Sequence, residues 1–183
     1  MAMTLITTET ASSSASLAFT ASIDNTYKLY IFKFYDIHPS DSGVYLTWQG
    51  STDGGSNYNI QCTTTMFRSS HAEDDSGTPT INYDSGSDAA QSSSYINIDG
   101  QMANANDHAT AGEIFLFNPS STTYVKHWYS IGNVMTHHAD PAARTMVHYT
   151  SGYFNTTDNI DAVSFMMQSG NIDAGTIKMY GVG

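Results

Sequence analysis

The sequence predicts an all-β protein: a single-domain β-sandwich, jelly-roll-like, with about a dozen short antiparallel strands. Three observations support this fold class. No stretch of about eleven residues places apolar side chains at helical spacing. Only 13% of the 183 residues are charged, so Ser, Thr, Asn, Gln and Gly must supply most of the polar surface, as in sheet proteins with many turns. Short segments rich in aromatic and β-branched residues alternate with turn residues along the chain. A closed barrel is less favoured because the segments differ in length.

The chain is expected to begin with an N-terminal arm or edge strand, residues 1–15, followed by the sandwich domain, residues 16–183. Residues 27–37 are dense in aromatic and β-branched side chains on both faces, which is typical of a central strand. Residues 44–49 alternate between apolar and polar and predict a strand with one buried face. Turn residues 38–43 separate the two segments, so we expect them to form a hairpin.

The inner face of the second strand of this hairpin is expected to contain Val44, Leu46 and Trp48. The remaining predicted strands are residues 3–8, 16–20, 59–67, 79–83, 94–98, 112–118, 123–131, 144–154, 161–167 and 174–181. A short helical turn is expected near residues 140–144, where Asp140 precedes Pro141. Residues 68–94 are polar and predict a long excursion with one short strand, either a mobile loop or an arm that reaches a partner.

The sequence Asn-Ile-Asp-Ala occurs twice near the C-terminus, at residues 159–162 and 171–174. Each copy precedes an apolar run, and good turn residues lie between the runs, which predicts a closing antiparallel hairpin. In this interpretation the Asx residues end the strands by bonding to the backbone. A metal bound through Asp161 and Asp173 is the alternative.

Residues 51–58 resemble the Asp-box, a turn motif of sialidases and many secreted β-proteins. Ser51, Asp53 and Gly55 match the motif, whereas Asn57 and Tyr58 replace its usual Thr and Trp. The resemblance implies a structural turn held by the Asp side chain, with no sialidase activity. Sialidases also need an arginine cluster for the sugar carboxylate, and this chain has only Arg68 and Arg144.

Other candidate ligands are scattered along the chain. His137, His138 and Asp140 form the densest histidine group, with His127 and His148 on flanking strands, but no metal-binding spacing joins them. We expect structural or surface roles for these residues, with a metal on a symmetry axis as the alternative.

The acid run Glu73-Asp74-Asp75 is expected to be a solvated loop, with a weak cation site as the alternative. Cys62 is the only cysteine and is expected to be a buried small residue. We therefore predict no catalytic residue, no cofactor and no metal.

Composition argues against several function classes. The net charge is −11 with only six Lys and Arg, which disfavours nucleic-acid binding and attachment to anionic lipid. Neither a secretory signal nor an apolar stretch long enough to span a bilayer is present in the sequence. Glu9 and Glu113 are the only glutamates besides Glu73, and no serine-hydrolase, P-loop or dinucleotide motif occurs. A carbohydrate-active enzyme is therefore a remote alternative.

Aromatic residues make up 12% of the chain. Tyr and Trp on a surface rich in Ser, Asn and Gly bind sugars or partner proteins. In the run Lys126-His127-Trp128-Tyr129, alternation places His127 and Tyr129 on one face and Trp128 on the other. One of these faces is expected to meet a neighbour or a ligand.

Four segments together carry a family resemblance: TYKLYIFKFYDIHPS, GSTDGGSNYN, IFLFNPSSTTYVKHW and GYFNTTDNIDAVSFMMQSGNIDAGTIKMYG. They resemble small virion structural proteins of marine tailed bacteriophages, of the decoration and tail-fibre-like kinds, over most of residues 16–181. The resemblance implies an all-β, often oligomeric module on the virion surface, made in the host cytoplasm. The expected function is that of a non-enzymatic capsid decoration (cement) protein, bound to the major capsid protein or tail proteins as a homotrimer or other homo-oligomer. The alternative is a tail-fibre module that recognises a host surface glycan or protein. No binding residue follows from the resemblance.

Overall fold

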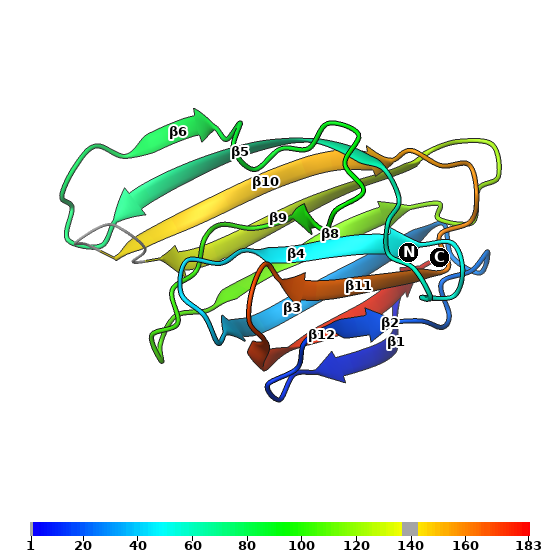
Figure 1. Cartoon of the computed structure of the whole chain (residues 1–183), viewed down its shortest axis with the longest axis horizontal. Coiled ribbons are helices and arrows are strands. Elements are labelled where there is room, and N and C mark those ends of the chain that lie inside the picture. Colours follow the sequence, from blue (N-terminus) through cyan, green and yellow to red (C-terminus); the bar gives the residue numbers. More distant parts are fainter. Residues whose placement is uncertain (1, 137–142) are drawn as a thin grey trace.

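The fold is all-β, as predicted. The structure is a computed structural model that describes residues 2–136 and 143–183, and within these residues it contains twelve strands and no helix (Figure 1). The helical turn predicted near residues 140–144 and the pair His137-His138 lie largely or wholly outside the described residues. The strands are β1 (Met3–Thr10), β2 (Leu17–Phe19), β3 (Leu29–Pro39), β4 (Leu46–Ser51), β5 (Cys62–Ala72), β6 (Thr80–Tyr83), β7 (Ile96–Asn97), β8 (Thr110–Phe117), β9 (Lys126–Thr136), β10 (Arg144–Phe154), β11 (Ala162–Met167) and β12 (Ile172–Val182).

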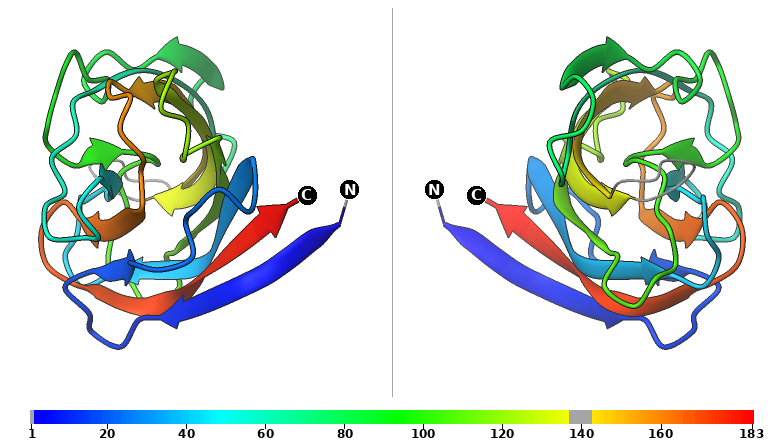
Figure 2. Two further views of the ribbon diagram at one scale, coloured as in Figure 1. Left: turned by 90° about the vertical axis from the view of Figure 1, so that its right-hand side faces the viewer. Right: turned by 90° about the vertical axis from the view of Figure 1, so that its left-hand side faces the viewer.

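Two antiparallel sheets share these strands. The large sheet has eight strands in the order β1-β12-β3-β8-β9-β10-β5-β6, and the small sheet has four in the order β2-β11-β4-β7. The large sheet curves around the small one, and β1 lies beside β12 at its lower edge (Figure 2). Each of the predicted strand segments overlaps one observed strand, and residues 144–154 coincide with β10. The jelly-roll-like connectivity remains a prediction.

Both predicted hairpins are wrong. β3 lies in the large sheet between β12 and β8, whereas the strand that follows it, β4, lies in the small sheet between β11 and β7. Likewise β11 belongs to the small sheet and β12 to the large one. Each turn therefore carries the chain from one sheet to the other, and the doubled Asn-Ile-Asp-Ala flanks a sheet crossing.

The two crossing turns bind each other at one end of the sandwich. The Asn171 N–H donates to Ser40 Oγ at 2.8 Å, and the Ser40 N–H donates to the Asn171 carbonyl at 3.0 Å. Ser169 Oγ donates to Asp41 Oδ2 at 3.1 Å. The polar residues of one turn therefore form hydrogen bonds with those of the other turn. The sequence of each turn on its own does not predict these bonds.

Aromatic side chains fill the space between the sheets. Trp48 of the small sheet is fully buried, as predicted, and its ring centroid lies 4.9 Å from that of Trp128 and 5.2 Å from that of Phe154, both on the large sheet. Phe32 and Phe165 also meet across the two sheets, at 5.7 Å. Edge-to-face and tilted ring pairs of this kind add to the free energy gained by burial.

The far side of the small sheet is covered by loops. Gln49 points to that side and is nonetheless fully buried. Its Nε2 donates to the carbonyls of Ile60 at 3.1 Å and Ser94 at 2.8 Å, so β4 is tied to both covering loops. The second covering loop belongs to the predicted excursion of residues 68–94.

That excursion is held against the body of the protein. Its first residues continue β5 as far as Ala72, and after β6 the chain returns alongside the start of β5. There Cys62 and Ser92 exchange backbone hydrogen bonds of 2.8 and 3.0 Å, and the Ala89 N–H donates to Thr64 Oγ1 at 2.9 Å. Residues 73–79 form the loop between β5 and β6.

Candidate functional site: the open face of the large sheet

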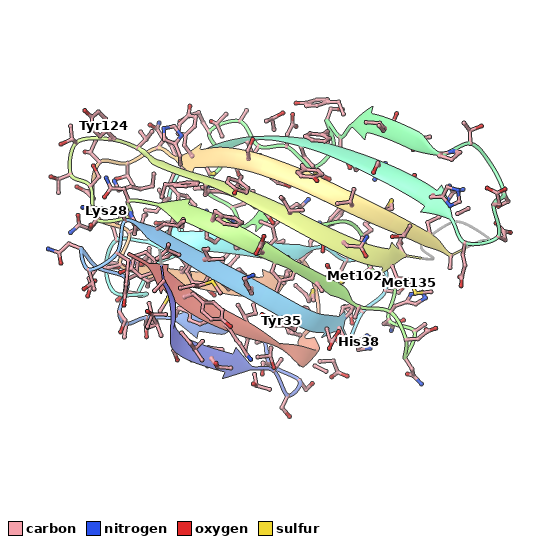
Figure 3. All side chains as sticks on the ribbon, turned by 180° about the vertical axis from the view of Figure 1, so that it is seen from behind. Lys28, Tyr35, His38, Met102, Tyr124 and Met135 are labelled. Carbon is pink, nitrogen blue, oxygen red and sulfur yellow. The ribbon has the colours of Figure 1, made fainter. Side chains whose placement is uncertain are left out.

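Loops cover the outer side of the small sheet, whereas no other segment of residues 2–136 and 143–183 covers the outer side of the large sheet (Figure 3). We call it the open face and define it by the outward side chains of β3, β8, β9, β10 and β5. Figure 3 shows it in front, with Tyr35 labelled on β3. The predicted alternation in β9 is confirmed: Trp128 is buried in the core, while His127 and Tyr129 point outward.

One row of large side chains crosses the open face from β8 to β6. The strand register aligns Glu113 with Ile131, Ile131 with Tyr149, Tyr149 with Phe67, and Phe67 with Tyr83. The rings of Phe67 and Tyr149 stack, with centroids 4.9 Å apart and planes 7° from parallel. Phe67 is 48% exposed and Tyr83 60%. Cross-strand aromatic pairs stabilise the sheet, but these pairs still leave large apolar surfaces in contact with water.

The open face has almost no formal charge. The outward residues of this face are those between Leu29 and Tyr35 in β3 and all outward residues of β5, β8, β9 and β10. When histidines are counted as neutral, only Lys33 and Glu113 among them have a formal charge. They neutralise each other in an ion pair of 3.0 Å, and this carboxylate raises the pKa of Lys33. At the β12 border, Lys178 Nζ lies 5.4 Å from the centroid of Tyr35, a cation–π distance.

Hollows indent the open face, and three of them are lined mainly by its outward side chains. One, of about 480 Å³, lies over β5, β6 and the start of β10 and includes Ile81 and Val147. A second, of about 320 Å³, lies beside the Lys33–Glu113 pair. The third, of about 410 Å³, lies over β5, β9 and β10, and we call it the Tyr153 hollow.

The predicted histidine group is divided by the sheet. His127 points outward and its ring lies 6.1 Å from that of Tyr153, whereas His148 is fully buried on the inner side. A single metal therefore cannot bind both. Within residues 2–136 and 143–183, no three His, Cys, Asp or Glu side chains lie close enough together to hold a metal.

His148 instead faces Asp99, a buried partner that the sequence analysis missed. Their Nδ1 and Oδ1 atoms are 3.5 Å apart, and both side chains are fully buried. Thr110 Oγ1 also donates to the Asp99 carboxylate. Burial raises the pKa of Asp99, while His148 opposes the shift. Two glycines leave room for the pair, since a Cβ at Gly100 would lie 2.3 Å from His148 Cε1 and one at Gly132 would lie 2.8 Å from the Asp99 carboxylate.

The two aspartates of the C-terminal repeat lie apart. Asp161 precedes β11 and Asp173 lies in β12, beyond the far end of β11, and a six-residue strand is about 20 Å long. One ion cannot bridge them. Asp161 Oδ1 accepts a hydrogen bond of 3.0 Å from the Gly54 N–H, so it bonds the neighbouring turn, where we expected a bond to its own backbone.

The Asp-box turn has the structural role that the resemblance implied. Ser51 Oγ donates to Asp53 Oδ1 at 2.7 Å, and the Asn57 N–H and Nδ2 donate to the same carboxylate at 2.9 and 2.7 Å. These hydrogen bonds lower the pKa of Asp53 to about 2, and the bond from the Asn57 side chain has the largest effect. Gly54 and Gly55 have φ of +71° and +87°, which glycine adopts without strain.

The remaining candidates have structural surroundings. Cys62 is fully buried, as predicted, and burial raises the pKa of its thiol to about 12, so it is a poor nucleophile. The acid run lies in the loop after β5, where the Glu73 N–H donates to the Ala143 carbonyl at 2.8 Å and Asp75 pairs with His71 at 3.3 Å. Arg68 pairs with Asp84 at 3.2 Å.

In the part of the chain that the structure describes, no helix is long and apolar enough to cross a membrane. Comparison with protein-family models, with curated proteins and with solved structures found no match to this chain. The open face is thus the feature that points to a function.

Proposed function

We propose that this chain is a non-enzymatic structural protein of a bacteriophage particle, an accessory decoration protein that docks on the particle through its open face. The partner is the major capsid protein or a tail protein, and several copies of the chain, as a homotrimer or other homo-oligomer, lie on the virion surface. The observation that carries this proposal is an almost uncharged, aromatic sheet face on a chain with a net charge of −11.

Two features support docking through this face. Contiguous exposed apolar surfaces on soluble proteins mark interaction sites, and aromatic residues dominate the energetics of interfaces. The sheet edges are poorer docking sites. The outer strands β6, β2 and β7 have four, three and two residues, and β1 is interrupted by a bulge between Leu5 and Thr7. Short and bulged edge strands are devices that prevent pairing with another chain.

The test uses particles of the phage that encodes the chain. The double variant Phe67→Ser and Tyr149→Ser removes the stacked pair from the open face, and we expect it to lose binding to particles stripped of this protein. Tyr124→Ser is the matched control, because Tyr124 is 69% exposed but lies in the loop before β9. Full binding by the double variant, or absence of the chain from purified particles, would refute the proposal.

A second candidate function is a tail-fibre module that binds a host receptor, and the Tyr153 hollow is the observation that favours it. Aromatic walls around a concave site are common in small-molecule sites. In this role the soluble protein blocks phage adsorption to host cells, which a capsid decoration protein does not do.

A further inference from the structure

We propose that the Tyr153 hollow is a binding site for a neutral sugar, a pyranose ring or short oligosaccharide without acidic groups. The inference deepens the receptor-binding role and rests on it. The shape, the side-chain chemistry and the charge of the hollow all support it.

The shape comes from large and small side chains in neighbouring rows. The register aligns Tyr129 with Ser151 and Ser151 with Thr65 in one row, and Tyr153 with Thr63 in the next. Small side chains on β10 and β5 therefore adjoin tyrosines on β9 and β10. The result is a depression of about 410 Å³, within the range of small-molecule sites.

The walls offer aromatic surface. Phe117, at the end of β8, is 38% exposed and its ring centroid lies 5.8 Å from that of Tyr129. On the other side the rings of His127 and Tyr153 meet edge to face. The C–H face of a pyranose ring is apolar and packs on such rings, while its rim of hydroxyls requires polar partners.

The floor offers hydroxyl groups with free hydrogen-bonding capacity. Thr63 Oγ1 accepts bonds from the Gln91 N–H at 3.2 Å and from Gln91 Nε2 at 3.1 Å, so its own O–H remains available to donate. The Ser151 hydroxyl makes no hydrogen bond to another described residue. Both can exchange hydrogen bonds with sugar hydroxyls.

The charge excludes acidic and basic ligands. No Asp, Glu, Lys or Arg is among the residues that line the hollow. With His127 counted as neutral, a phosphate, sulfate or acidic sugar would find no cation there, and the chain as a whole would repel it. A cationic ligand would find no carboxylate. A neutral polyol with an apolar ring face matches the aromatic walls and the hydroxyl groups of the hollow.

The experiment is saturation-transfer NMR on the purified chain with three neutral disaccharides, namely cellobiose, lactose and N,N′-diacetylchitobiose, and with sialyllactose as the acidic comparison. We expect at least one neutral sugar to bind at millimolar concentration and sialyllactose to bind no better than lactose. Tyr153→Ala should weaken binding by about tenfold through loss of the stacking ring.

Two further variants keep the result interpretable. Ser151→Trp fills the hollow from an exposed strand position and should abolish binding even if Tyr153→Ala does not fold. Tyr35→Ala removes another exposed tyrosine of the same face, 40% exposed and remote in register from the hollow, and should bind as the unmodified chain does. The inference is overturned if none of the neutral sugars binds, if only sialyllactose binds, or if Ser151→Trp binds normally. Because no phage is involved, a failure here is distinct from a failure to block adsorption.

Discussion

Asp53 shows how much one exposed side chain can organise. Its carboxylate accepts hydrogen bonds from Ser51 and Asn57 and so holds the turn after β4 in shape. Every one of those bonds favours the ionised form, which is why the pKa falls from its usual value of 3.8 to about 2. A group whose folded pKa is depressed stabilises the fold above its unfolded pKa and loses that effect as the pH falls through its folded pKa.

We therefore expect Asp53→Asn to destabilise the protein most at pH 5 and least near pH 2. The unmodified chain should lose stability between about pH 4 and pH 2, while the variant should not show this pH-dependent loss. Urea unfolding across that range measures the difference in the free energy of unfolding between the two proteins. Asp173→Asn is the control, since that exposed carboxylate accepts no side-chain hydrogen bond from another described residue. If the difference in the free energy of unfolding stays constant with pH, the turn does not depend on the ionised carboxylate.

At the scale of elements, the sequence predicts where strands lie better than which strands pair. The density of β-branched and aromatic residues located every strand, because this signal is local. Pairing was misjudged at residues 38–43 and 168–171, because the same turn residues serve a hairpin and a sheet crossing equally well. In the folded chain the two turns bond each other through Ser40 and Asn171, which are 131 residues apart, and the sequence of either turn alone does not encode this contact.

The candidate site was predictable only in part. Alternation around Trp128 correctly placed His127 and Tyr129 on one face, and the same rule applied to β10 would have placed Tyr149 and Tyr153 on that face too. The alignment of Tyr149 with Phe67, and of Tyr153 with Thr63, depends on the pairing of β10 with β5, which no local pattern encodes. The partnership of Asp99 with His148 was missed for the same reason.

Gly175 marks a second element-scale constraint, in the bulge where β12 passes β3. Its φ is +117°, and a Cβ there would lie 2.7 Å from the Asp36 carbonyl oxygen and from Ile37 Cα. These are backbone or backbone-bound atoms that cannot move aside easily. We expect Gly175→Ala to cost about 2–6 kcal/mol, from backbone strain of ~1–3 kcal/mol and overpacking of ~1–3 kcal/mol.

Gly54→Ala is the matched comparison for this prediction. Gly54 also has a positive φ, +71°, but nothing lies within 4 Å of the position of its Cβ. We expect that variant to cost only about 1–2 kcal/mol, the strain of the left-handed conformation alone. Equal losses in denaturant unfolding of the two variants would mean that the close approach of β12 to β3 contributes nothing.

At the scale of the whole molecule, the two sheets have opposite outer surfaces. The small sheet is covered by loops fixed by residues such as Gln49, and the large sheet is left open and aromatic. The acidic residues lie mainly in loops and turns, so few of the charges that make up the net charge of −11 lie on the open face. Such a distribution makes free chains repel one another through their acidic loops, and it leaves the proposed docking surface almost without charge.

This distribution predicts the salt dependence of docking. Since Lys33 and Glu113 already neutralise each other, an interface through the open face forms without intermolecular ion pairs. Raising NaCl from about 0.05 to 0.5 M screens the repulsion between neighbouring copies of this acidic chain, because the Debye length falls well below 10 Å. Binding to particles, measured by co-sedimentation, should therefore hold constant or tighten. A steep loss of binding with salt would place the contact on the charged loops and exclude the open face as the docking surface.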